Sequence, residues 1–188
     1  LRTRLNSMIG FADVLLEGFD GPLTERMEED VRLIRDSGRH LKSLIGDILD
    51  LSKIEAGRME LRYEQVDINQ LAKDVVATSM SLAQEKSLYL DLQTDDTITT
   101  VPFDQVRIRQ VLINIVGNGI KFTEKGGVTV KITNQDEHVL LSIKDTGIGI
   151  EQEDIDIVFE QFRQVDGSMT RAAGGTGLGM PISKKLVE

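Results

Sequence analysis

Three side chains on one predicted helix face combine two amides with a cation. Asn114 and Asn118 are four residues apart and Lys121 follows Asn118 by three, so in a helix all three lie on one face. Amide oxygens can complete the coordination of a hydrated Mg²⁺ that also holds substrate phosphates, and a lysine ammonium suits a phosphate as a point charge. The face therefore predicts a metal and phosphate site, with an ordinary exposed polar face as the alternative.

A turn containing glycine follows a predicted strand at Asp145, with Gly147 and Gly149 at intervals of two. A carboxylate at a strand end can accept a hydrogen bond from an exocyclic amine such as that of adenine. Glycines let the backbone approach a flat ligand closely. The segment predicts a contact with a nucleobase, and the alternative is a simple turn.

A cluster of glycines occupies residues 174–179 (Gly-Gly-Thr-Gly-Leu-Gly), and Pro181 is predicted to stand at the first position of the helix that follows. Backbone amides that converge at a helix N-terminus commonly hold phosphate. No Lys-Ser or Lys-Thr pair follows at the spacing of a Walker A loop. The cluster predicts a phosphate-binding loop of another kind, with a flexible linker as the alternative.

The composition argues against several classes of function. The 188 residues carry a net charge of −9 and include no cysteine. An acidic chain repels a phosphate backbone, so we expect no nucleic-acid partner. A disulfide scaffold and thiol chemistry are excluded, and two isolated histidines argue against a zinc site. No apolar run reaches the length of a membrane span, so we expect a cytoplasmic fragment without membrane contact, whether or not the parent protein is anchored.

The first third of the sequence has the spacing of two amphipathic helices. The first runs from Leu1 to about Gly18, and the second begins after Thr24, whose side chain can cap it. In the second helix an approximate heptad is widened beyond a two-stranded seam. Its apolar positions are Met27, Val31, Leu33, Ile34, Leu41, Leu44, Ile45, Ile48, Leu51 and Ile54. An antiparallel hairpin cannot bury so broad a face alone, so we expect a homodimer that forms a four-helix bundle.

The remaining sequence predicts helices packed on a mixed sheet. Asp67 and Asp104 are expected to cap helices that reach about Lys86 and Phe122, and strands are expected at residues 88–92, 98–101, 128–133 and 139–144. The fold class is therefore α+β, with a two-layer α/β sandwich behind the hairpin. We place the boundary between residues 62 and 63, so that 1–62 form the hairpin and 63–188 the second domain.

In order and spacing, these motifs resemble those of the sensor histidine kinase family, whose ATP-binding domain has the Bergerat fold of the GHKL superfamily. By this resemblance, the N box contains Asn114 and Asn118, the G1 box Asp145, Gly147 and Gly149, the F box Phe159 and Phe162, and the G2 box Gly175, Gly177 and Gly179. The resemblance implies ATP and Mg²⁺ as ligands, and an ATP lid from about Phe159 to Gly179.

The resemblance also implies roles for individual side chains. Asn118, with Asn114, would hold Mg²⁺, and Asp145 would accept a hydrogen bond from the adenine amine. Lys121 would bind phosphate, and Asn114 and Lys121 would also act in catalysis. Arg163 and Arg171 are basic lid residues that could reach the γ-phosphate. The nucleotide contacts further include Phe122, Thr176 and Leu178, together with the phenylalanines and glycines of the boxes.

The N-terminal residues Leu1–Asn6 resemble the end of the H box, normally His-Glu-Leu-Arg-Thr-Pro-Leu-Asn. The phosphoacceptor histidine would then lie two positions before Leu1, outside this sequence, and the glutamate beside it would be the general base. Thr3 would orient water for dephosphorylation of a partner. A lone bundle histidine such as His40 is more often a packing residue than an acceptor. We therefore expect the chain to bind ATP without autophosphorylating.

The sequence departs from the family pattern at several points. Arg4 replaces the usual proline, so a helix kink is expected to be weaker. Gly117 and Gly119 stand where Ser and Ala are commoner, at a cost of up to about 1 kcal/mol per glycine within a helix. Both ends interrupt predicted helices, and the family continues with two more strands. We therefore expect both domains to be truncated and one sheet edge to be exposed.

Three functions are compatible with these residues. The first is a protein-histidine kinase that moves the γ-phosphoryl of MgATP to a histidine and then to an aspartate of a response regulator, with phosphatase activity toward that regulator. The second is a GHKL ATPase similar to Hsp90, MutL or gyrase. Those families place a glutamate base where Asn114 stands, and an amide cannot take a proton from water, which favours the kinase. The third is a dimeric scaffold without catalysis, against which the four boxes argue.

Overall fold

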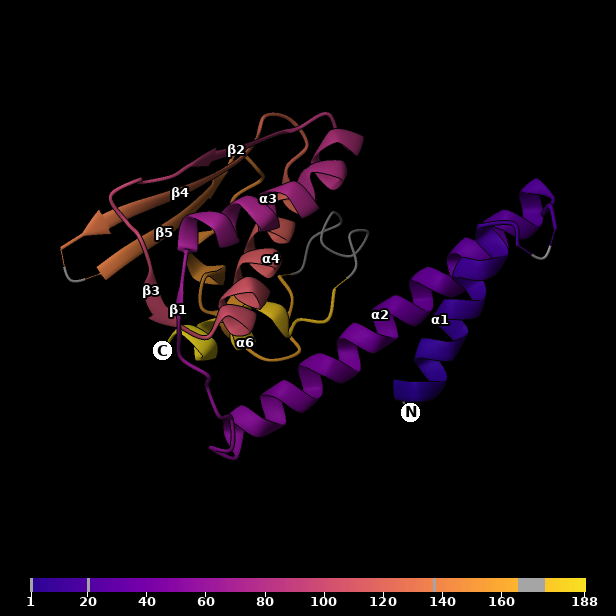
Figure 1. The fold of residues 1–188 in the computed structure, drawn as a ribbon, viewed down its shortest axis with the longest axis horizontal. Helices are drawn as coiled ribbons and strands as arrows, with labels where there is room; N and C mark the ends of the chain where they lie inside the picture. The colour runs from indigo at the N-terminus through magenta and orange to yellow at the C-terminus, as the bar shows by residue number, and fades with distance from the viewer. Residues whose placement is uncertain (1, 20, 137, 166–174) are drawn as a thin grey trace. The chain divides into compact units, whose positions relative to one another are not determined.

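The computed structural model of the chain describes residues 2–19, 21–136, 138–165 and 175–188 (Figure 1). They form two compact units, Leu1–Gly57 and Arg58–Glu188. The division thus falls five residues before the boundary expected between 62 and 63, at the end of the second helix rather than at the start of the first strand.

The first unit is a hairpin of two helices, α1 (Arg2–Leu16) and α2 (Glu25–Glu55). Thr24 caps α2 as predicted, since its Oγ1 accepts a hydrogen bond from the Met27 backbone N–H at 3.3 Å. Beyond the other end of α2, Gly57 takes a φ of 62°, which glycine adopts without strain. The caps explain why the hairpin begins and ends its long helix at these residues.

Contacts between α1 and α2 are close but bury little apolar surface. A Cβ at Gly38 would lie 3.0 Å from Cγ1 of Ile9, so the missing side chain lets the helices approach. Nearby, Arg39 Nη2 lies 3.0 Å from the carboxylate Oδ1 of Asp13. Burial, reinforced by Asp50, raises the pKa of Asp47 further along α2, while the charge of His40 opposes that shift.

The second unit contains two small sheets. Strands β2 (Tyr89–Gln93), β4 (Gly127–Gln135) and β5 (His138–Asp145) form a mixed sheet in which β4 pairs parallel with β2 and antiparallel with β5. The second sheet pairs β1 (Glu64–Val66) with β3 (Val101–Phe103) antiparallel. The predicted mixed sheet is therefore confirmed.

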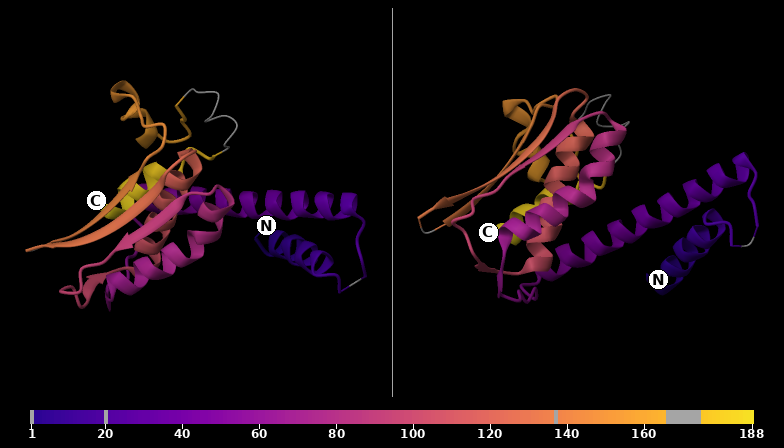
Figure 2. Two further views of the ribbon diagram at one scale, coloured as in Figure 1. Left: turned by 90° about the horizontal axis from the view of Figure 1, so that it is seen from above. Right: turned by 45° about the horizontal axis from the view of Figure 1, so that its top comes forward.

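Helices α3 (Ile68–Glu85), α4 (Gln105–Phe122) and α6 (Gly179–Val187) lie on one side of the β2-β4-β5 sheet (Figure 2). Asp67 and Asp104 cap α3 and α4 as predicted, each accepting a hydrogen bond from a backbone N–H three residues on. Two short 3₁₀ helices, η1 (Gln152–Asp154) and η2 (Ile157–Phe159), follow β5. The arrangement confirms the α+β sandwich.

A continuous apolar core joins the helices to one face of the sheet. Val128, Val130 and Ile132 of β4 are buried, while the residues between them point to the other face, as the alternation of a strand requires. Leu71 of α3 and Val116 of α4 pack into the same cluster. This packing fixes α4 and the end of β5, which carry the predicted site residues Asn114, Asn118, Lys121, Phe122 and Asp145.

Two details of the second unit differ from the predictions. The strand expected at residues 98–101 begins three residues later, at Val101, because Ile98 is held in a turn in which its N–H donates to the carbonyl of Asp95 at 3.1 Å. The last helix begins at Gly179, so Pro181 is its third residue rather than its first. Proline is tolerated there because the first-turn N–H groups have no acceptor within the helix.

None of the described helices combines the length and apolar character needed to cross a membrane.

Candidate functional site

The polar face of α4 holds the predicted metal and phosphate residues. Asn114, Asn118 and Lys121 are all half-buried, as expected for side chains that line the edge of a packed helix. They lie in the second half of α4, on turns whose other face carries the buried residues Leu112 and Val116. The core therefore holds the helix that carries these three groups.

Asn114 joins the N box to the glycine cluster. Its Nδ2 donates to Ser183 Oγ at 2.8 Å and lies 3.9 Å from the Met180 sulfur. A side chain at Gly179 would overlap the amide oxygen of Asn114, so only glycine allows this approach. Two motifs separated by more than sixty residues therefore meet through a hydrogen bond and a close contact.

Lys121 lies beside the start of the same glycine cluster. Its Nζ would be 3.2 Å from a Cβ at Gly175, and it also stands 4.8 Å from the centre of the Phe122 ring. Burial lowers the pKa of this lysine, because the charged form loses solvation. A partly desolvated ammonium next to a glycine-rich backbone is suited to an anionic ligand.

The Asp145 loop is seated on the last turn of α4. Strand β5 ends at Asp145, one residue after the predicted end at residue 144, and one of the Asp145 carboxylate oxygens accepts a hydrogen bond from the Gly147 N–H at 2.9 Å. A Cβ at Gly147 would lie 2.6 Å from the Phe122 carbonyl oxygen, which itself accepts from the Ile148 N–H at 3.3 Å. Gly147 is thus required by close approach, and Asp145 is held beside the N box.

Gly119 explains part of the departure from the family pattern in α4. A Cβ there would lie 3.0 Å from Cγ2 of Val128 and 3.5 Å from Cβ of Asp145. Its absence lets α4 pack tightly against β4 and the Asp145 loop. Gly117 has no such neighbour within 4 Å, and nothing in the structure explains it.

The predicted lid is described at both ends. Phe159 closes η2, with the Lys184 Nζ 5.1 Å above its ring. Phe162 is exposed and takes a φ of 60°, and its N–H donates to the Gly177 carbonyl at 3.0 Å. The Arg163 guanidinium contacts the Glu160 carboxylate at 2.7 Å. Arg171 lies outside the described residues.

The glycine cluster leads into α6 through residues with separate tasks. Gly177 takes a φ of 67°, and a Cβ there would lie 2.8 Å from the Arg163 carbonyl oxygen. Thr176 Oγ1 accepts from the Leu178 N–H at 3.0 Å, and the Leu178 side chain is fully buried. Leu178 therefore anchors the segment in the core, while Thr176 and Gly177 shape its turn. Gly149 takes a φ of 73° in the Asp145 loop and has open space around it.

Thr3 belongs to the first unit. It is exposed on α1, where its carbonyl accepts a hydrogen bond from Ser7 Oγ at 3.1 Å. The other predicted site residues among those described belong to the second unit.

The chemistry of this cluster suits a magnesium nucleotide. The Asn114 amide and the Lys121 ammonium lie beside the glycine segment, and Asn118 follows one turn after Asn114 on the same helix. Amides and an ammonium are groups that bind a hydrated cation and phosphate. The described residues include no group of three or more His, Asp or Glu placed to bind a metal together. A cation held by Asn114 and Asn118 would therefore take further ligands from water and phosphate.

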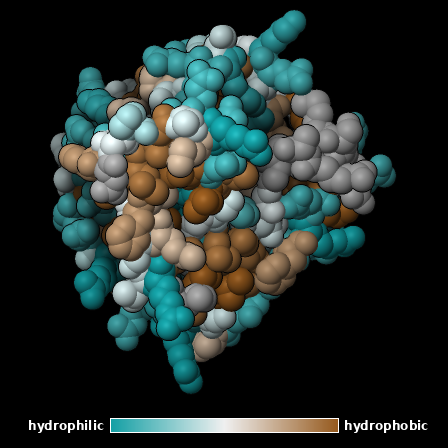
Figure 3. Space-filling model, turned by 90° about the vertical axis from the view of Figure 1, so that its right-hand side faces the viewer, coloured by the Kyte–Doolittle hydropathy of each residue, from teal (hydrophilic) through white to brown (hydrophobic). Residues whose placement is uncertain are grey.

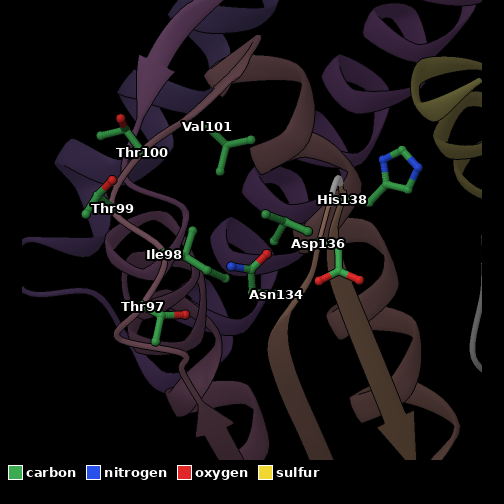
Figure 4. A pocket seen from close by; sticks show the side chains of 9 residues that line it. Thr97, Ile98, Thr99, Thr100, Val101, Asn134, Asp136 and His138 are labelled. Carbon is green, nitrogen blue, oxygen red and sulfur yellow. The ribbon is translucent and has the colours of Figure 1, made fainter.

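A separate hollow of about 270 Å³ lies at the other end of the sheet (Figure 4). Its walls come from the segment that leads into β3, and from the end of β4, the turn after it and the start of β5. The lining residues are Thr97, Ile98, Thr99, Thr100, Val101, Asn134, Asp136, His138 and Val139. It contains none of the predicted site residues, and its lining includes no lysine or arginine to receive a nucleotide phosphate, so we assign it no role in the site.

Two polar residues that support the site were not predicted. Ser183 could have been found from the helical spacing, since it follows Gly179 by four residues. Thr146 Oγ1 accepts from the Gly127 N–H at 3.0 Å and donates to the Lys125 carbonyl at 2.9 Å, which ties the Asp145 loop to the start of β4. No local pattern in the sequence predicts these hydrogen bonds of Thr146, because they depend on how β4 and β5 pair.

Both units match known families. Residues 1–57 match the family described as His Kinase A (phospho-acceptor) domain, and residues 103–188 match Histidine kinase-, DNA gyrase B-, and HSP90-like ATPase. The circadian input-output histidine kinase CikA of Synechococcus elongatus is 42% identical over 191 residues, which cover 100% of this chain and 25% of CikA. The sensor protein GacS of Pseudomonas syringae is 38% identical, over 100% of this chain and 21% of GacS.

A similar solved structure is full-length ShkA in complex with AMPPNP, with a TM-score of 0.79 and 35% identity over 98% of this chain and 38% of ShkA. The fold and the site together define a helical hairpin followed by an ATPase domain of the GHKL type. The chain belongs to the sensor histidine kinases and corresponds to their catalytic core. It spans about a quarter or less of the length of the two curated relatives named above.

Proposed function

We propose that this chain is the ATP-dependent phosphotransfer core of a two-component sensor kinase. The observation that carries the proposal is the meeting of three motifs: Asn114 contacts Gly179 and Ser183, Lys121 Nζ lies beside Gly175, and Gly147 packs against the end of α4. These contacts bring an amide side chain, an ammonium and the backbone of two glycine-containing turns close together. AMPPNP in the structure of ShkA supports ATP as the ligand.

Each group has a distinct task in this proposal. Asn118, with Asn114, would hold Mg²⁺, which when bound neutralises charge on the phosphates. Asp145 would accept a hydrogen bond from the adenine amine through its carboxylate. Lys121 would bind phosphate as a point charge, and its burial strengthens that attraction. Catalysis then consists mainly of positioning a γ-phosphoryl group and balancing its charge.

The phosphoryl group would pass to a histidine two positions before Leu1 and then to an aspartate of a response-regulator receiver domain. Thr3 would orient the water that removes phosphate from that regulator. We propose no acceptor role for His40, because the carboxylate with which it interacts electrostatically, that of Asp47, lies seven residues along the same helix and not next to it in the sequence, where the family has its glutamate.

The hairpin would complete its core by pairing with a second copy. Met27, Ile34, Leu41 and Ile48 follow one another at seven-residue intervals along α2, and their exposed fractions are 52%, 60%, 45% and 44%. Exposed apolar side chains gather in patches on the molecular surface (Figure 3). A heptad seam of this length is typical of helices that pack side by side, so we propose a homodimer through a four-helix bundle.

Phosphorylation from γ-labelled ATP separates this function from its alternatives. The 188-residue chain should acquire no acid-labile, base-stable label, whereas an extension carrying His-Glu before Leu1 should acquire it. A His40→Gln substitution in the extended protein should leave the label intact. ATP hydrolysis without labelling in the extended protein would favour a GHKL ATPase, and nucleotide binding without either reaction would favour a scaffold.

A further inference from the structure

Lys86 lies far from the site in sequence, yet its side chain ends at the last turn of α4. Its Nζ donates to the carbonyl oxygens of Ile120, Lys121 and Thr123 at 3.0, 2.6 and 3.3 Å. Lys86 is the residue that ends α3, so the contact joins the C-terminal ends of two neighbouring helices. Three backbone carbonyl oxygens at this helix end therefore bind the lysine ammonium as they could bind a cation.

The carbonyls at this position would otherwise lack partners. The last four carbonyls of a helix have no N–H within the helix to accept from, and they carry a partial negative charge of about half an electron. The Lys86 ammonium donates hydrogen bonds to the Ile120 and Lys121 carbonyls, and the Ile148 N–H donates to the Phe122 carbonyl. The end of α4 is therefore closed by Lys86 on one side and by the Asp145 loop on the other.

This turn carries the group proposed to bind phosphate. The Lys121 carbonyl receives the Lys86 ammonium, while the Lys121 side chain extends to Gly175. The negative end of a helix repels a polyphosphate, and the effect is strongest within the last turn. A fixed positive charge among these carbonyls offsets that repulsion and also holds the turn in place.

We infer that Lys86 is a positioning residue for polyphosphate binding: its ammonium neutralises and orders the C-terminal turn of α4 so that Lys121 can receive the phosphates. The inference rests on the proposed function, because it assumes a nucleotide at the Asn114, Lys121 and Asp145 cluster. It adds a residue that touches neither nucleotide nor metal and acts through Lys121 and the helix end.

Three substitutions separate charge from hydrogen bonding. Lys86→Arg keeps both charge and donors, Lys86→Gln keeps donors without charge, and Lys86→Met keeps neither. Lys73→Met is the matched control, since Lys73 is exposed on α3 and its loss changes the net charge equally. Competition against a fluorescent ATP analogue, with Mg²⁺ present, gives the affinities for ATP, ADP and adenosine.

Lys86→Gln and Lys86→Met should lower the affinity for ATP by about three- to thirty-fold, the affinity for ADP by less, and the affinity for adenosine by less than about two-fold. Lys86→Arg and Lys73→Met should bind all three ligands as the wild type does. If Lys86→Met does not fold, the comparison of Lys86→Arg with Lys86→Gln still shows whether the positive charge is needed for ATP binding.

Equal losses for ATP and adenosine in the Gln variant would reduce Lys86 to a structural helix cap and overturn the inference. Wild-type affinities in that variant would overturn it as well, while leaving the proposed function untouched. If the wild-type chain binds neither ATP nor adenosine, the proposed function itself fails.

Discussion

The two units of this chain solve the problem of burial in different ways. Among the described residues of the hairpin, the buried hydrophobic side chains are Leu5, Ala12 and Leu51, whereas the second unit has a continuous core drawn from α3, α4, β2 and β4. The hairpin instead exposes a heptad row along α2. The difference teaches that the second unit can be stable by itself, while the first depends on what covers its apolar face.

The largest expected effect comes from placing charge in that heptad row. Leu41→Glu combined with Ile48→Glu should convert a dimer into monomers, because a charge in a bundle core is costly to bury. Light scattering at micromolar concentrations measures the mass. A wild-type chain that is monomeric under these conditions would contradict the bundle, and a double variant that stays dimeric would contradict the chosen seam.

Shortening a core side chain of the second unit should lower that unit's stability by an amount that does not depend on dimerisation. Leu71 is 1% exposed, so Leu71→Ala should destabilise that unit by about 2–5 kcal/mol at every protein concentration. Leu41→Ala in the hairpin should leave the same transition unchanged. Denaturant unfolding, followed at two protein concentrations, checks both results. A dependence of the Leu71→Ala cost on concentration would mean that the units are not independent.

Two glycines of α4 sharpen the comparison within the second unit. Gly119→Ala should cost about 1–3 kcal/mol, because the added methyl would crowd Cγ2 of Val128 at 3.0 Å. Gly117→Ala should instead stabilise by up to about 1 kcal/mol, since the position is open and alanine favours a helix. Thermal unfolding of the two variants gives the sign, and equal shifts would contradict the packing described for α4.

The smallest expected effect is a dependence on pH in the second unit. Hydrogen bonds from Thr97, and from the Asn134 backbone, lower the pKa of Asp95. Stabilisation by this carboxylate is therefore complete above its unfolded pKa of about 4 and is lost as pH falls through the lower folded pKa. Asp95→Asn should reduce stability at pH 7 and make less difference near pH 2. A constant difference across that range would contradict the linkage.

Local signals in the sequence predicted much of this fold. Thr24, Asp67 and Asp104 cap the helices that they were expected to cap, because a cap depends on residues three positions away. The β1-β3 pair was not predicted in the same way. Its strands have three residues each and are set by pairing between Gln65 and Pro102, which no local periodicity reports.

The site shows the same division between local and distant information. The residues of α4, the Asp145 turn and the glycine cluster were identified from their types and spacing. The Ser183 contact with Asn114 spans 69 residues and the Lys86 contact with the Ile120 carbonyl spans 34. Such contacts follow from how α3, α4 and α6 pack, so they become visible with the fold and not before it.

Nucleotide titration of the second unit's site tests the account most directly. In the presence of Mg²⁺, a fluorescent ATP analogue should bind the wild-type chain, and Asp145→Asn or Asn118→Ala should weaken it by roughly 1–3 kcal/mol, the cost of leaving a polar partner unpaired. Asp91→Asn, an exposed position on β2, is the matched control and should bind as the wild type does. Unchanged affinity in both site variants, or an equal loss in the Asp91 control, would contradict the assignment of this site to MgATP.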